Sequence, residues 1–189
     1  MKCFEIIEQL ELHSPASYAE EWDNIGLLVG RRDKEVKTIY IALDATDDVI
    51  EEAVSLGADM LLTHHPLIFR KMSRITTDDF IGRRVYKLIR NDISYFAMHT
   101  NFDVMGMADA AADELLLQER QVLNVTYEDD ISKEGCGRAG CLKARMSVAD
   151  LAEFVKQKFH VPNVRVFGDL GDIAKKVAVM PGSGLSLIH

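Results

Sequence analysis

The sequence has few of the features that mark secreted or membrane-embedded proteins. It contains three cysteines in 189 residues, and this odd number argues against a disulfide framework and fits a reducing compartment. It has no run of about 18 apolar residues, which argues against a transmembrane helix. Its N-terminus alternates charged and apolar residues where a signal peptide would carry an apolar stretch. We therefore expect a cytoplasmic protein without a membrane partner.

Basic residues are outnumbered by acidic residues in the sequence. There are 22 basic and 30 acidic residues, and the resulting net charge of −8 argues against DNA as a partner, because phosphate backbones require a cationic surface. One segment differs, since its basic residues far outnumber Asp78 and Asp79: Arg70, Lys71, Arg74, Arg83, Arg84, Lys87 and Arg90. This segment is interpreted either as a solvated helix face or as a local surface that attracts anions.

The hydrophobic pattern predicts an α/β fold. Helical spacing and capping residues predict helices at residues 3–12, 46–56, 78–90, 107–117 and 148–159. Short β-rich runs predict strands at 25–29, 38–43, 59–63, 93–98, 141–145, 164–167 and 176–180, and the first two are expected to pair across a charged turn. This alternation predicts mixed, mostly parallel sheets flanked by helices.

The polar, acidic stretch from residue 118 to residue 135 indicates a connector or an irregular excursion between two lobes. The first lobe is expected to span residues 1–120, and the second spans residues 121–189.

Histidines follow two of the predicted strands. His64, His65 and Pro66 come directly after one strand, and the segment from His99 to Asp103 follows another. The carboxyl ends of parallel strands meet at one edge of a sheet, so the two groups are expected to lie together. Adjacent histidines within a strand would point to opposite faces, but Pro66 takes the backbone out of the strand and lets both imidazoles face one cavity. The alternative is a pair of loop histidines without a shared role.

This donor set favours a divalent metal. Imidazole nitrogen and carboxylate oxygen suit zinc, iron, manganese, nickel or cobalt, so His64, His65 and Asp103 form a plausible half of a two-metal site. Such a site lowers the pKa of bound water and supplies a hydroxide nucleophile. The sequence has no nucleophile elbow, Walker loop, Rossmann fingerprint or H-E-x-x-H, so metal-assisted hydrolysis is the sharpest enzymatic hypothesis.

Two further residues near this edge have open roles. Asp44, at the end of the strand 38–43, either contacts the metal ligands without binding the metal or acts in a turn or cap. Trp22, which begins the triplet Trp-Asp-Asn, either shapes a pocket or packs as an ordinary tryptophan beside a turn.

Several segments together resemble the Nif-three-like dinuclear metal proteins, the GTP cyclohydrolase I type 2 homologs. The segments that carry the resemblance are Trp22–Leu27, Ala42–Thr46, Gly57–Asp59 running into His64–Pro66, His99–Asp103 with Gly106, Gly135–Gly140, the helix at Val148, and Gly182–Gly184. They occur in the family's order and span nearly the whole chain.

The resemblance implies an α/β fold of two similar lobes, a ring-shaped homohexamer and two metal ions per subunit. It implies that His64, His65 and Asp103 are metal ligands, and that His99 is a supporting or proton-transferring group. The family's remaining ligands, a His and a Glu one helical turn apart, belong to a C-terminal segment that this sequence lacks, because it ends at His189 soon after the glycine turn. We therefore expect an incomplete second lobe.

Two functions follow as hypotheses. The first is a metal-dependent, hydrolase-like protein that acts on a purine nucleotide such as GTP through metal-bound hydroxide, with Arg70 or Lys71 holding the phosphates. This substrate rests on the resemblance alone. The second is a non-catalytic metal-binding or interaction protein whose ring-like assembly presents a surface to a partner.

Overall fold

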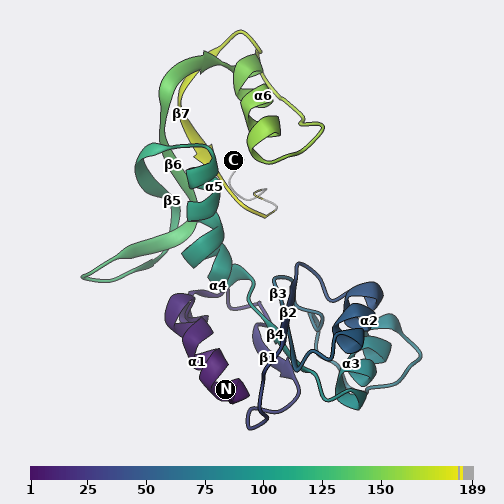
Figure 1. Ribbon diagram of the computed structural model, residues 1–189. Coiled ribbons are helices and arrows are strands. Elements are labelled where there is room, and N and C mark those ends of the chain that lie inside the picture. The colour runs from purple at the N-terminus through teal and green to yellow at the C-terminus, as the bar shows by residue number, and fades with distance from the viewer. Residues whose placement is uncertain (183, 185–189) are drawn as a thin grey trace. The chain divides into compact units, whose positions relative to one another are not determined.

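The computed structural model describes residues 1–182 and residue 184. Ser183 of the expected glycine turn and the chain end at His189 lie outside the described residues. The chain divides into two compact units, Met1–Phe102 and Asp103–His189 (Figure 1). The lobe boundary expected between residues 120 and 121 falls inside the second unit. No helix among the described residues is long and apolar enough to cross a membrane.

The first unit is built around a four-stranded sheet. Its elements are α1 (Cys3–His13), a 3-10 turn (Ala16–Tyr18), β1 (Gly26–Val29), β2 (Ile39–Ala42), α2 (Asp47–Ser55), β3 (Met60–Thr63), α3 (Phe80–Arg90), β4 (Ser94–Ala97) and α4 (Thr100–Phe102). The strand order is β1-β4-β3-β2. Strands β2, β3 and β4 are parallel, and β1 is antiparallel to β4. The prediction of a mixed, mostly parallel sheet is confirmed for this unit.

Helices cover both faces of this sheet, with α1 on one side and α2 and α3 on the other (Figure 1). Neighbouring residues of a strand point to opposite faces. Leu61 and Tyr95 therefore pack with α2 and α3, whereas Met60 and Phe96 pack with α1. Because β3 and β4 are covered on both faces, they read as continuous apolar runs in the sequence.

The helix boundaries follow capping residues. The Thr46 side chain accepts a hydrogen bond from the Val49 amide at the start of α2, and the Asp79 side chain accepts one from the Gly82 amide at the start of α3. Gly57 adopts a positive φ of 64° just after α2, a conformation that glycine adopts without strain. These local signals explain why most predicted helices in this unit are confirmed within a few residues.

The predicted pairing of the first two strands is wrong. Both strands exist, but β1 and β2 occupy opposite edges of the sheet. The charged segment between them does not form a hairpin turn, because its backbone bonds to the N-terminus: Cys3 N–H donates to the Lys34 carbonyl and Phe4 N–H to the Arg32 carbonyl, both at 2.9 Å. The chain thus crosses over before β2 begins and pairs with β3.

The second unit has an antiparallel sheet of order β5-β6-β7. Its elements are a π-helical turn (Asp103–Met107), α5 (Ala108–Glu114), β5 (Gln118–Glu128), β6 (Lys133–Ser147), α6 (Val148–Lys158) and β7 (Ile173–Val179). The mostly parallel sheets expected for both lobes are therefore found in the first unit alone. Ser147 caps α6, and its side chain accepts a hydrogen bond from the Asp150 amide.

Two predictions for this unit are wrong. Residues 118–135 are not a connector or an irregular excursion, because most of them form β5 and the start of β6, and the two strands pair from Gln118 with Cys141 to Glu128 with Lys133. Leu123, Val125 and Tyr127 alternate with polar residues within β5, but ten of its 11 residues are exposed, so no buried face distinguishes the strand from a polar segment. The strand expected at residues 164–167 is also absent, and this segment has no regular structure.

Candidate metal centre

The two strands that precede the histidine groups, β3 and β4, are neighbours in the sheet. Strands β3 and β4 run parallel, with Thr63 opposite Ala97. His64 and His65 follow the first strand directly, and His99 follows the second after Met98. The expectation that these two histidine groups share one edge of the sheet is therefore confirmed for His99.

The three imidazoles form one cluster. One ring nitrogen from each of His64, His65 and His99 lies within 4.8 Å of the others. The ring centroids of His64 and His65 are 4.9 Å apart, and that of His99 lies 5.2 Å from His64 and 5.6 Å from His65. The side chain of His99 is 17% exposed.

The turn after β3 explains how adjacent histidines face one site. The buried Tyr95 hydroxyl accepts a hydrogen bond from the Leu67 N–H at 2.7 Å and lies 3.1 Å from the His65 carbonyl oxygen. The Thr63 hydroxyl donates to the same carbonyl at 2.9 Å. These bonds fix the backbone around Pro66 after it has left the strand. Burial raises the pKa of Tyr95, so its hydroxyl keeps its proton at neutral pH.

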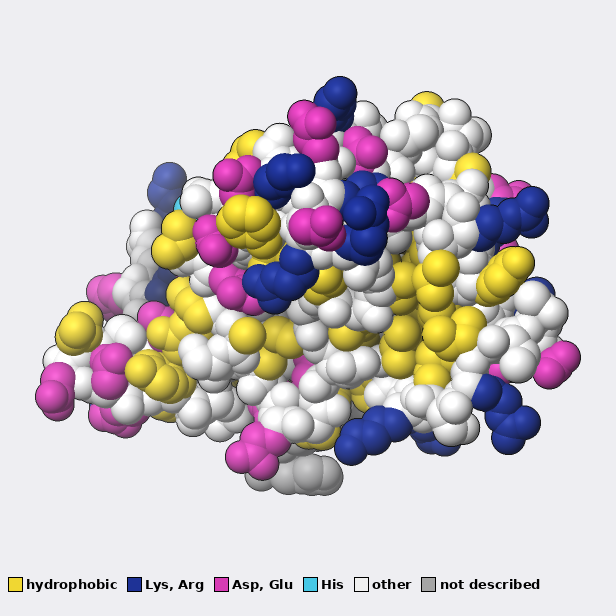
Figure 2. Space-filling model, turned by 90° about the horizontal axis from the view of Figure 1, so that it is seen from below, with side chains coloured by type: hydrophobic (Ala, Val, Ile, Leu, Met, Phe, Trp, Pro, Cys, Tyr) yellow, Lys and Arg dark blue, Asp and Glu magenta, His cyan; other side chains and the backbone are white. Residues whose placement is uncertain are grey.

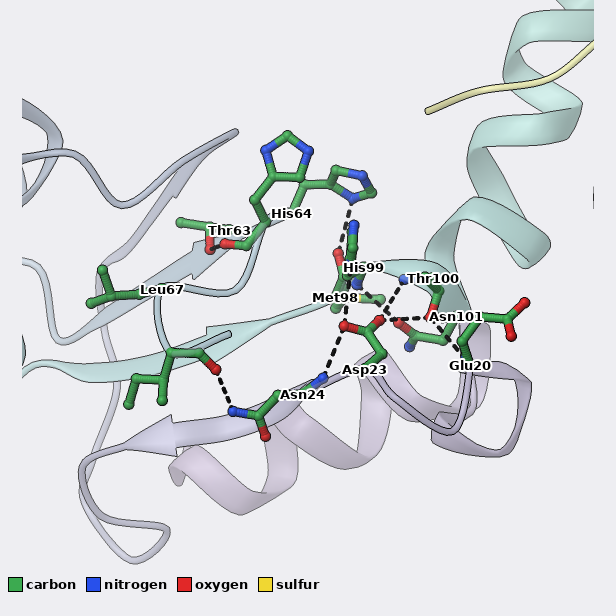
Figure 3. Close-up of polar contacts among 12 residues, drawn as sticks. Glu20, Asp23, Asn24, Thr63, His64, Leu67, Met98, His99, Thr100 and Asn101 are labelled. Atoms are coloured by element: carbon green, nitrogen blue, oxygen red, sulfur yellow. Dashed lines mark hydrogen bonds and ion pairs between the residues drawn. The ribbon is translucent and has the colours of Figure 1, made fainter. Parts of the chain in front are cut away.

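Each imidazole has an oxygen partner at Nδ1. His64 Nδ1 lies 3.0 Å from the Met98 carbonyl oxygen, His65 Nδ1 lies 2.8 Å from Asp44 Oδ1, and His99 Nδ1 lies 3.0 Å from Asp23 Oδ1. Figure 3 shows the contacts of His64 and His99. An oxygen acceptor at Nδ1 favours the tautomer with its proton there and leaves Nε2 as the metal-binding atom, which is the usual arrangement in protein metal sites.

Asp23 is the most enclosed of these partners, with a side chain that is fully buried. It accepts hydrogen bonds from the Thr100 N–H at 3.0 Å and the Thr100 hydroxyl at 2.6 Å, in addition to its contact with His99 (Figure 3). Burial acts to raise the pKa of Asp23, but the hydrogen bonds from Thr100 and His99 outweigh it and lower the pKa. Asp23 is therefore a fixed carboxylate that orients His99.

The donor set fits a transition metal. Neutral imidazole nitrogen binds zinc at about 2.0–2.1 Å and also suits iron, nickel and copper, so three such atoms within 4.8 Å of one another lie near one coordination sphere. Oxygen partners behind the ligands raise their basicity and hold their orientation. The cluster could therefore hold a divalent ion with little rearrangement.

Asp103, the third ligand expected from the sequence, is not part of the first unit. It begins the second unit and the π-helical turn, whereas the histidines belong to the first unit. Its role as a metal ligand stays a prediction, as does the proton-transfer role of His99. Asp44, whose role the sequence left open, contacts His65 and so supports a candidate ligand.

Sequence reasoning missed Asp23 and Tyr95 as residues of this site. Asp23 is 76 residues from His99 and Tyr95 is 30 from His65, so no local spacing links them. Asp23 lies in one of the segments that carry the family resemblance, and that was the available signal. Trp22, for which ordinary packing was an open alternative, is 58% exposed.

Known proteins resemble this chain in fold and in sequence. A GTP cyclohydrolase 1 type 2 homolog from Clostridium perfringens is 40% identical over 186 residues, which cover 97% of this chain and 70% of that protein. A Bacillus cereus protein related to NIF3 superimposes with a TM-score of 0.90 at 28% identity, covering 97% of this chain and 77% of its own. Reduced HcgD from Methanocaldococcus jannaschii gives a TM-score of 0.79 at 36% identity, covering 98% of this chain and 71% of its own.

The family assignment rests on the full length of the sequence. The model of the family described as Duf34/NIF3 (NGG1p interacting factor 3) matches residues 1–189. The resemblance stated from the sequence motifs is thereby confirmed, and the chain belongs to the Duf34/NIF3 family.

Proposed function

We propose that this chain binds a divalent transition-metal ion through Nε2 of His64, His65 and His99. One observation carries the proposal: three imidazoles from two neighbouring strand ends converge, and each has an oxygen partner at Nδ1. Loop histidines without a shared role have no reason to meet in this way. Asp23 and Asp44 hold two of the rings, and the Met98 carbonyl holds the third.

The reaction that this site best supports is hydrolysis of a small molecule. A bound divalent ion lowers the pKa of water and polarises carbonyl or phosphoryl groups. The residues of the chain supply orientation: Asp23 fixes His99, and Tyr95 with Thr63 fixes the turn that bears His65. The C. perfringens relative is named a GTP cyclohydrolase 1 type 2 homolog, so a purine nucleotide is the substrate that we propose to test first.

The wider assembly is part of the same proposal. The family resemblance supports a second ion, Asp103 as a further ligand, and a ring-shaped homohexamer. The net charge of −8 argues against a nucleic acid as the partner of the chain. Figure 2 shows basic and acidic side chains interspersed on one face, without the continuous cationic surface that a phosphate backbone requires.

Elemental analysis of protein purified without chelators tests the metal site. We expect stoichiometric metal in the wild-type chain and its loss in a His64→Ala, His65→Ala double variant. His13→Ala is the matched control, because His13 is an exposed histidine at the end of α1 in the same unit. Unchanged metal content in the double variant would contradict the proposal.

His99→Asn separates the two roles considered for His99. A ligand role predicts lower metal content, whereas a proton-transfer role predicts normal metal content and slower turnover. Incubation of the metal-loaded protein with GTP, followed by a formate assay, tests the reaction. Formate release supports the hydrolase, and stoichiometric metal without turnover of GTP supports the rival, a non-catalytic metal-binding scaffold.

A further inference from the structure

Two exposed aromatic rings lie next to the histidine cluster. Trp22 is 58% exposed and Phe69 is 52% exposed, and their ring centroids are 5.8 Å apart with an interplanar angle of 56°. The Trp22 ring also meets the His99 ring edge-on at 6.1 Å. Other aromatic residues of the chain are as exposed, such as Phe80 at 53%, so the distinguishing feature of this pair is that the two rings contact each other beside a candidate metal centre.

Both rings are fixed to the cluster through the residues beside them. Asp23, which follows Trp22, holds His99 and Thr100. Asn24 donates a side-chain hydrogen bond at 2.5 Å to the carbonyl of Ile68, the residue before Phe69 (Figure 3). The Trp-Asp-Asn triplet therefore places one ring, orients one histidine and anchors the backbone that bears the second ring.

A packing role does not account for the pair. Neither Trp22 nor Phe69 belongs to a hydrophobic cluster among the described residues. About half of each side chain stays in contact with water. The free energy that their burial contributes to this unit is therefore small compared with that of a core aromatic.

The charged residues beside Trp22 and Phe69 do not favour a ligand of one charge. Phe69 is followed by the cations Arg70 and Lys71, whereas Trp22 is preceded by the anions Glu20 and Glu21. Because these charges are of opposite sign, the two exposed aromatic rings are the feature of this surface that can select a ligand. Flat rings stack on aromatic side chains with little dependence on their substituents.

We propose that Trp22 and Phe69 form a stacking subsite for a planar heteroaromatic ring, placing the ligand beside His99. This inference deepens the proposed function, since it names the class of molecule that the histidine site receives. Because the two rings are tilted by 56° to each other, a bound ring that stacks on one of them meets the other at an angle. The subsite itself contains no metal ligand, so ring binding and metal binding can be measured separately.

The sequence provides a direct reporter, because Trp22 is its single tryptophan. We would titrate the metal-loaded protein with guanosine, GTP and inorganic tripolyphosphate, exciting at the red edge of tryptophan absorption and correcting with free N-acetyltryptophanamide. We expect saturable quenching by guanosine and GTP and none by tripolyphosphate. Phe69→Ala should weaken binding by about tenfold, the scale of one lost stacking partner. Phe69→Leu, which keeps apolar bulk, should also weaken it.

Phe80→Ala is the matched control, since Phe80 is a 53% exposed phenylalanine at the start of α3 in the same unit. It should leave the quenching unchanged. Equal quenching by tripolyphosphate, full binding by Phe69→Ala, or no quenching by either ring compound would overturn the subsite. Metal content measured on the same samples separates the two proposals: normal metal without ring binding contradicts the subsite alone, and ring binding without metal contradicts the metal centre alone.

Discussion

The two units of this chain use their strands in opposite ways. In the first unit, β3 and β4 have four residues each, are almost entirely buried, and end at the edge where the histidines emerge. In the second unit, β5 and β6 have 11 and 15 residues, and β5 is exposed along nearly its whole length. Short strands covered on both faces bring their ends together at one place, and this is where the first unit carries its candidate chemistry.

The two units also differ in what their interiors contain. The first unit has two apolar clusters, one on each face of its sheet. The second has a smaller apolar cluster and a buried cation, Arg138, which is 5% exposed. The first unit also buries a cation, Lys34, which is 8% exposed, but its apolar clusters are larger, so a single polar network should carry a larger share of the stability of the second unit.

The largest expected effect is that of Arg138→Ala. Arg138 donates two hydrogen bonds to the Asp109 carboxylate, both at 2.8 Å, and others to the carbonyls of Gly135, Gly137 and Val104. Its removal leaves these buried carbonyls without their donor, which should destabilise the second unit by about 3 kcal/mol. Urea denaturation with hydrogen exchange should show the loss in residues 103–182, with metal binding by the first unit retained.

Arg145→Ala is the control for this variant, because Arg145 is an exposed cation on the same strand. It should change stability by less than about 0.5 kcal/mol. Equal effects of the two variants, or a loss spread evenly over both units, would show that the buried network does not distinguish the second unit from the first.

The same contrast explains what could be predicted from the sequence. The first unit has apolar runs, caps at Thr46 and Asp79, and a glycine after α2, and each of these is a local signal of known geometry. Strand β5 has a weaker signal, since the short alternation of Leu123, Val125 and Tyr127 lies in a polar segment whose residues are almost all exposed. The order β1-β4-β3-β2 was likewise out of reach, because it depends on where residues 32–34 bond to the N-terminus.

The candidate site was predictable to the extent that strand ends determine it. His64, His65 and His99 follow adjacent parallel strands, and this much follows from a general rule of α/β sheets. The partners at Nδ1 are distant in sequence and become apparent in the folded unit alone. A carboxylate such as Asp23 gives no spacing signal, although it decides which nitrogen of His99 is available.

Tyr95→Phe tests the polar support beneath the histidines. The variant removes the hydroxyl that accepts from the Leu67 N–H and lies beside the His65 carbonyl, in a fully buried position. An unsatisfied buried amide costs about 1–3 kcal/mol, so we expect a loss of about 2 kcal/mol in the first unit. Because the turn also orients His65, metal affinity should fall by about tenfold.

Tyr40→Phe is the matched control, since its hydroxyl bonds to Glu52 at the surface. It should leave metal affinity unchanged. If Tyr95→Phe lowered stability without changing metal affinity, the turn around Pro66 would not need this hydroxyl to present His65, and the link between the buried layer and the site would be broken.

Helix caps should act alike in both units. Thr46 caps α2 in the first unit and Ser147 caps α6 in the second, each accepting a hydrogen bond from an amide three residues on. Thr46→Ala and Ser147→Ala should each cost about 1 kcal/mol, with faster amide exchange confined to the capped helix. A much larger effect of Ser147→Ala would mean that the second unit unfolds as a whole when one helix end loosens.

The smallest expected effect is a dependence on pH that separates two similar carboxylates. Asp59 accepts hydrogen bonds from the Lys37 and Thr38 amides, which lower its pKa, and the turn residue Asp129 accepts from Ile131 and Ser132 with the same consequence for its pKa. A lowered pKa in the folded state stabilises the protein above the unfolded pKa of about 3.9 and ceases to do so as the pH falls through the folded value.

Asp59→Asn should therefore destabilise the first unit at neutral pH by less than about 1 kcal/mol, and the difference from wild type should shrink between about pH 5 and about pH 3. Asp129→Asn should have no measurable effect anywhere in this pH range, because the Asp129 carboxylate is exposed and water screens its charge. Urea denaturation across this pH range measures both. If the two variants showed the same dependence of stability on pH, the Asp59 carboxylate would be as well hydrated as that of Asp129. Its hydrogen bonds to two backbone amides before β2 would then add no stability.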